Sequence, residues 1–107
     1  GKQLFFEQFS GRYFRSTMED VQRATYDINR SLAIRKYAYL NDFYKYLGLE
    51  PIKPGREYGW TSDELIDDQC CVDWIDFTYE KVVMDDGLEC YIIAMKDEPM
   101  INFADYN

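Results

Sequence analysis

The strongest constraint on the fold is the pair Asp86-Gly87, which lies between the apolar runs 82–84 and 88–95. Two such runs joined by Asp-Gly predict an antiparallel hairpin, because a type I′ turn requires positive φ at both central residues. The run 88–95 is apolar at every position except Glu89, which is typical of a strand buried on both faces and central in its sheet. Residues 72–77 alternate ahead of the hairpin and predict a third strand, although the strand order stays open.

The first half of the chain predicts two helices. Apolar residues at three- and four-residue steps over 17–35 form one stripe of a long helix, and Ser16 with Glu19 fits a capping box at its start. A shorter helix over 41–47 ends at Gly48, where glycine lets the chain turn left-handed at no steric cost.

These elements predict an α+β fold, in which N-terminal helices, one long and one short, pack on a small three-stranded antiparallel sheet. The 107 residues are expected to form a single domain around one core. The aromatic segment 4–14 has no clean period, so we expect an irregular or short helical lead-in whose rings pack on the core. An exposed hydrophobic patch for a partner is the alternative for this segment. No stretch approaches the roughly 18 consecutive apolar residues of a membrane span.

The chain contains no histidine, which excludes Ser-His-Asp and Cys-His nucleophile systems and histidine zinc sites. The three cysteines, Cys70, Cys71 and Cys90, fall short of the four ligands that a structural zinc site requires. We interpret them as buried structural residues of a protein from a reducing compartment, with a Cys71–Cys90 bridge as the alternative. We expect neither a metal nor another cofactor.

The charges are distributed unevenly along the chain. Residues 1–60 hold ten bases and seven acids, whereas residues 61–107 hold two bases and thirteen acids, and the net charge is −8. This balance argues against direct binding of a nucleic acid backbone. Solubility and attraction between the two halves explain the acidic half most simply. The alternatives are a basic partner or mimicry of a nucleic acid that inhibits a host enzyme.

Clustered carboxylates leave one enzymatic alternative open, a carboxylate-based metal-dependent hydrolase. The acids that would carry it form two groups between residues 63 and 76: Asp63, Glu64, Asp67 and Asp68, followed by Asp73 and Asp76. A solvated loop explains the first group, and an exposed strand edge explains the second.

A series of short motifs between residues 15 and 103 resembles a family of proteins of unknown function from gut Firmicutes and their phages or other mobile elements. The motifs are residues 40–44 (LNDFY), 47–49 (LGL), 59–60 (GW), 74–77 (WIDF) and 85–93 (DDGLECYII). The resemblance implies a bacterial or phage origin. It also implies a domain on the cytoplasmic side, tethered in the full-length protein by an apolar N-terminal region. It brings no catalytic residues with it.

We therefore expect a non-enzymatic protein–protein interaction module of a phage or mobile-element protein. The partner is another protein or a second copy of this chain, and the expected contact surface consists of Phe5, Phe6, Tyr58 and Trp60. Tyrosine and tryptophan anchor many protein interfaces, and these four aromatic residues come from the lead-in and from the loop around Gly59.

Overall fold

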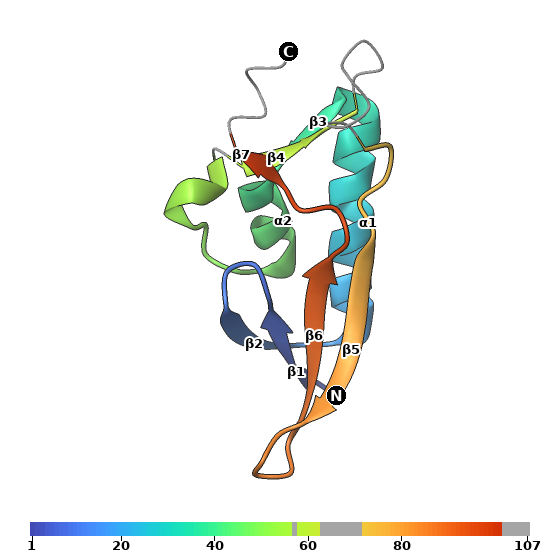
Figure 1. Cartoon of the computed structure of the whole chain (residues 1–107). Coiled ribbons are helices and arrows are strands. Elements are labelled where there is room, and N and C mark those ends of the chain that lie inside the picture. Colours follow the sequence, from blue (N-terminus) through green and yellow to red (C-terminus); the bar gives the residue numbers. More distant parts are fainter. Residues whose placement is uncertain (57, 63–71, 102–107) are drawn as a thin grey trace.

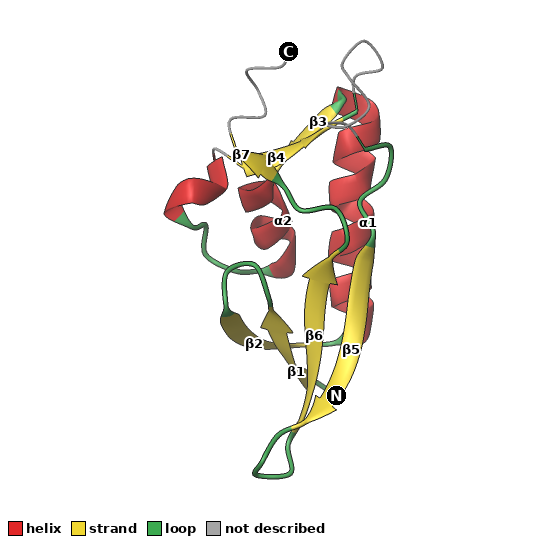
Figure 2. Ribbon diagram, viewed as in Figure 1, coloured by secondary structure: helices red, strands yellow, loops and turns green. Residues whose placement is uncertain are grey.

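The structure, a computed structural model, describes residues 1–56, 58–62 and 72–101. The helices lie within the first 56 residues, and strands precede, separate and follow them (Figures 1 and 2). In chain order they are β1 (Gln3–Glu7), β2 (Arg12–Ser16), α1 (Met18–Arg35), β3 (Tyr37–Tyr39), α2 (Leu40–Leu47), the 3₁₀ helix η1 (Lys53–Arg56), β4 (Tyr58–Thr61), β5 (Phe77–Val83), β6 (Glu89–Met95) and β7 (Met100–Ile101).

The strands form two sheets. Sheet A has the order β2-β1-β6-β5, with β1 and β6 parallel and the other neighbours antiparallel. Sheet B has the order β3-β4-β7 and is antiparallel. The α+β content is confirmed, but the prediction of helices packed on a single three-stranded antiparallel sheet is wrong, and strands hold more residues than helices.

Two segments account for this error. The segment 4–14, predicted as an irregular or short helical lead-in, forms the β1–β2 hairpin instead. Its rings do not all pack on the core, since Phe5 is buried on one face of β1 while Phe6 lies on the other. Residues 72–76 form no strand. The side chain of Asn29 pairs with the backbone of Ile75 instead, accepting from its N–H at 2.6 Å and donating to its carbonyl at 3.0 Å.

Both predicted helices are confirmed. Helix α1 begins one residue later than expected, and the predicted cap is wrong: Thr17, not Ser16, accepts the hydrogen bond from the Asp20 N–H at 3.0 Å. Ser16 is the last residue of β2 and is therefore extended. Helix α2 ends at Gly48 with φ of 82°. Among the described residues, no helix combines the length and the apolar character that a bilayer crossing requires.

The predicted hairpin is confirmed as β5–β6, and β6 is central in its sheet, as expected. The prediction of a type I′ turn is wrong, because only Gly87 of the Asp86-Gly87 pair has a positive φ, 86°. The Gly87 N–H donates to the Met84 carbonyl at 2.9 Å and the Met84 N–H donates to the Leu88 carbonyl at 2.7 Å. These bonds describe a three-residue loop in which glycine takes the left-handed position.

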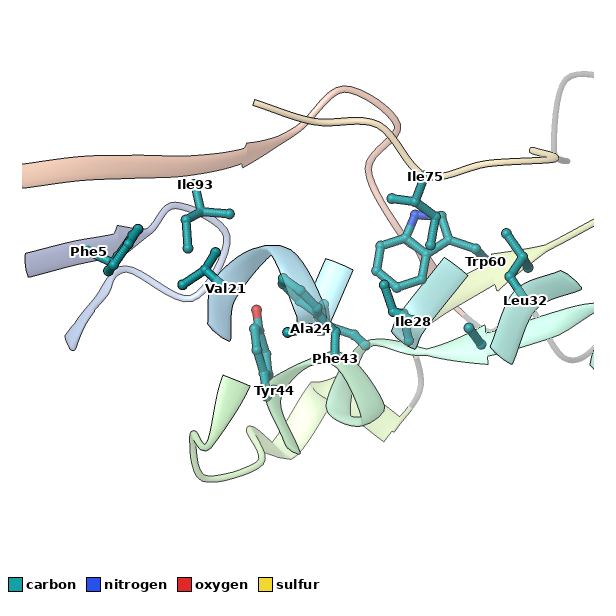
Figure 3. Packing of buried hydrophobic residues seen from close by; sticks show 12 residues of the cluster. Phe5, Val21, Ala24, Ile28, Leu32, Phe43, Tyr44, Trp60, Ile75 and Ile93 are labelled. Carbon is teal, nitrogen blue, oxygen red and sulfur yellow. The ribbon is translucent and has the colours of Figure 1, made fainter. Parts of the chain in front are cut away.

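The core lies between α1 and the inner face of sheet A, and α2 closes it from a third side. Figure 3 shows Phe5 of β1 and Ile93 of β6 directed toward Val21 of α1, with Phe43 and Tyr44 of α2 beside them. All five side chains are inaccessible to solvent. One face of sheet A is thus used to build the core.

Candidate interaction surface

The opposite face of sheet A is apolar. Because strand side chains alternate, the neighbours of the core residues point away from α1. The pairing register brings them together across the strands. We call this surface the outer apolar face: Leu4 and Phe6 of β1, Tyr13 of β2, Val82 of β5, and Cys90, Ile92 and Ala94 of β6.

No described element covers this face. In Figure 1, α1 lies behind β5, and no helix or further strand crosses in front of β1, β6 and β5. The residues of the hydrophobic core, together with the apolar residues packed against it, include none of the outer apolar face. The sheet therefore separates two apolar surfaces, of which only the inner one is covered.

Side chains on the face shield one another in part. Tyr13 is 56% exposed, and its ring lies 4.7 Å from that of Phe6 between centroids. Cys90 is 2% exposed, and this burial raises the pKa of its thiol. A thiol that stays protonated is a poor nucleophile, so Cys90 contributes apolar surface to this face and no reactive group.

The two edges of the face carry opposite charges. Arg15 lies on the edge strand β2 and Glu80 on the edge strand β5, and both side chains are exposed. Neither forms an ion pair with any residue that the structure describes. Three strand spacings separate them, roughly 14 Å, so they flank the apolar centre.

The predicted contact surface does not exist as a unit. Phe5 and Trp60 are core residues, 0% and 2% exposed, and the indole N–H of Trp60 donates to the Asp97 carbonyl at 2.9 Å. Tyr58 is half-buried, with its ring edge against Phe9. Only Phe6 of the four predicted residues lies on the outer apolar face, because the pleat turns Phe5 and Phe6 to opposite sides.

Sequence reasoning missed most of this face, although a signal for it was available. The run 88–95 is apolar at both alternating positions, so each of its two faces requires a cover. The single long helix covers only one of them. A sequence that predicts two apolar faces of a sheet and one long helix therefore predicts that one face stays uncovered.

The acidic groups of the hydrolase hypothesis do not form a described site. Asp63, Glu64, Asp67 and Asp68 lie outside the described residues, as do Cys70 and Cys71. Asp73 and Asp76 are described and are exposed. Within the described ranges, no three cysteine, aspartate or glutamate side chains are close enough together to hold a metal ion.

A second surface feature lies along α1. A groove of about 280 Å³ is lined by Tyr26 and Trp74, which are 58% and 53% exposed, and by Asn29. The polar atoms of the Asn29 side chain are already used, by the Thr25 carbonyl and by the backbone of Ile75. The groove thus offers aromatic edges but no free buried polar group to orient a ligand.

Comparison with known proteins gives one match. The sequence profile of a family of unknown function, DUF6353, matches residues 1–104. Neither a curated protein nor a solved structure matches the chain.

Proposed function

The chain belongs to the DUF6353 family, whose function is unknown, and on that premise we propose that it is a non-enzymatic protein-interaction module. The outer apolar face is the surface through which it binds. The observation that carries the proposal is the apolar outer side of β1 and β6, the two central strands of an open sheet that has its helix on the other side.

The size of the face supports this proposal. Four strands at about 4.8 Å and five residues at about 3.4 Å give an area of roughly 300 Å². The largest apolar patch on a typical soluble monomer is roughly 300–600 Å² and is often functional, and the outer side of this sheet, charged edges included, reaches the lower end of that range. Isolated surface residues such as Ile34, 64% exposed on α1, have no such neighbours of their own kind across a sheet and need no explanation.

The chemistry of the described residues supports the non-enzymatic part of the proposal. The one described thiol, that of Cys90, is buried and kept protonated. Asp73 and Asp76, the described acids of the hydrolase hypothesis, are exposed.

A photo-crosslinking amino acid in place of Tyr13 tests the proposal in cells that express the full-length protein. Tyr13 is exposed and aromatic, so an aromatic photo-crosslinker replaces it with little disturbance. Tyr26 is the matched control, because it is equally exposed but lies on α1. We expect a protein adduct from position 13, none from position 26, and loss of the adduct when Phe6→Asp is added. Equal labelling from both positions, or none from position 13, would contradict the proposal.

We also propose that the protein comes from a phage or another mobile element and that this domain faces the cytoplasm, tethered to a membrane in the full-length protein. The resemblance of the motifs between residues 15 and 103 supports this proposal. Fractionation of cells that express the full-length reading frame tests it. Recovery of the protein in the soluble fraction alone would contradict the proposed membrane tether.

A further inference from the structure

The register of sheet A arranges the outer side chains in two rows. One row runs Arg15–Leu4–Cys90–Val82 from β2 to β5, and the next runs Tyr13–Phe6–Ile92–Glu80. Each row is apolar in its two middle positions. The β2 end of this pair of rows carries the cation and a phenol, and the β5 end carries the anion.

We infer that the partner of the outer apolar face is a second copy of the same chain, related by a twofold axis that runs parallel to the strands between β1 and β6. This inference rests on the proposed function, since it names the occupant of the same surface. Such an axis exchanges β2 with β5 and β1 with β6. Two sheets packed in this way lie about 10 Å apart, with their strands roughly aligned.

The rows match under this symmetry. Phe6 of one copy lies over Ile92 of the other, and Leu4 lies over Cys90, so apolar side chains cover apolar side chains. Tyr13 lies over Glu80 of the second copy, where its hydroxyl can donate to the carboxylate. Arg15 lies over Val82 of the second copy, one row (about 6.8 Å along the strand) from that carboxylate. Because the sheets are also about 10 Å apart, the Arg15 and Glu80 side chains pair only when both extend toward each other.

The other twofold axis in the plane of the face gives a poorer match. An axis perpendicular to the strands places β2 over β2 and β5 over β5. It collects both copies of Arg15 at one edge and both copies of Glu80 at the other. Like charges brought together at an interface oppose association, so the distribution of charge selects the axis parallel to the strands.

The area of the face sets the strength of the dimer. Roughly 300 Å² on each copy gives roughly 600 Å² in total, well below the ~1,200 Å² at the lower end of standard interfaces. We therefore expect a weak, transient dimer with a dissociation constant between roughly 1 µM and 1 mM.

Charge reversal at the two edges tests the symmetry. Sedimentation equilibrium is measured for the wild type, for Arg15→Glu, for Glu80→Arg and for an equimolar mixture of these two variants. Each variant alone faces like charges twice per dimer, so its dissociation constant is expected to rise about tenfold. In the mixture, the heterodimer pairs opposite charges at both edges, and association is expected to return to the wild-type level. The same substitutions on exposed edges are expected to leave the far-UV spectrum unchanged.

The outcomes separate this inference from the proposed function. A concentration-dependent dimer that the mixture restores supports it, as does an adduct from position 13 of twice the chain mass that is joined to residues 77–83. A strictly monomeric chain at millimolar concentration overturns it, as does a dimer strengthened by Arg15→Glu. If the monomer still gives the adduct from position 13 with another protein, the proposed function stands without the self-association. If no adduct forms either, both are overturned.

Discussion

The carboxylate of Glu7 is fully buried, although glutamate is a surface residue in most proteins. It accepts hydrogen bonds from the N–H groups of Phe9 and Ser10, at 3.2 and 2.7 Å, and from the Tyr44 hydroxyl at 2.9 Å. The first two bonds close the β1–β2 turn, and the third ties that turn to α2. The Tyr44 ring is also buried, so water cannot replace its hydroxyl.

The substitution Tyr44→Phe removes one of these three donors and keeps the aromatic ring. A hydrogen bond to a charged group contributes about 1.5–3 kcal/mol, so we expect the free energy of unfolding at neutral pH to fall by that amount. For a domain of this size, the loss corresponds to a melting temperature lower by roughly 6–20 °C. Urea titration and thermal unfolding measure the two quantities. Tyr26→Phe, which removes an exposed hydroxyl, is the control and should change stability by less than ~0.5 kcal/mol.

The pH dependence provides a sharper test. Burial, and then the negative charge of Glu7, raises the pKa of Tyr44 above its usual value of about 10. Because the pKa is higher in the folded state, this contribution to stability is complete below about pH 10 and declines above it, as the unfolded state loses the proton first. The stability gap between the wild type and Tyr44→Phe should thus be constant up to about pH 9. Above about pH 10 it should close at a rate that approaches roughly 1.4 kcal/mol per pH unit. A gap below 0.5 kcal/mol at neutral pH, or one that persists unchanged at about pH 12, would refute the reasoning.

Three further substitutions test the local structure by urea unfolding. Lys36→Gly should stabilise the chain by about 1 kcal/mol, because Lys36 ends α1 with φ of 69° in the left-handed region; a loss of stability would contradict this. Asn29→Leu should cost about 2–4 kcal/mol by leaving the buried N–H and carbonyl of Ile75 unpaired, and a cost under 1 kcal/mol would mean that water reaches them. Gly87→Ala should cost about 1 kcal/mol through its φ of 86°, since open space surrounds the added methyl group. An unchanged stability would show that the β5–β6 loop relaxes.

The elements that the sequence predicted correctly have local signals. Helix α1 shows its apolar stripe and α2 its terminal Gly48, and the β5–β6 hairpin shows two apolar runs around a turn. Each of these patterns is contained within one segment, so neighbouring residues suffice to recognise it. The type of the β5–β6 turn was not predicted correctly, because loops of two and of three residues both place glycine at a left-handed position.

The β1–β2 hairpin was not predicted, because the apolar pattern of its residues does not alternate as that of a half-buried strand does. Leu4, Phe5 and Phe6 are apolar at consecutive positions, and the buried Glu7 occupies a position where alternation predicts an apolar residue. The partner that explains this pattern is β6, more than eighty residues away and parallel to β1. A sheet with two apolar faces accounts for large apolar side chains at consecutive positions, and the described elements cover only one of these faces.

The candidate surface could be predicted only in part for a related reason. Aromatic character marks residues for burial and for binding alike, so Phe5 and Phe6 are indistinguishable in the sequence. Their roles diverge when β1 pairs in its register, which places Phe5 between Phe14 and Tyr91 and leaves Phe6 against Tyr13. The burial of Trp60 likewise depends on the Asp97 carbonyl, which no local pattern connects to it.

Glu7 connects the register of β1 to the choice of the face that builds the core. A shift of β1 by one residue would exchange its faces, sending Leu4 and Phe6 into the core and Phe5 outward. Apolar burial alone discriminates weakly between these registers, because both faces of β1 offer large apolar side chains. The carboxylate discriminates strongly, since its three donors lie on the inner side, at the β1–β2 turn and on α2. A shifted register would separate Glu7 from Tyr44 and leave the buried hydroxyl unpaired, at a cost of about 1–3 kcal/mol. The contacts of the buried acid therefore favour the register in which Phe5 faces the core and Leu4 and Phe6 lie on the uncovered face.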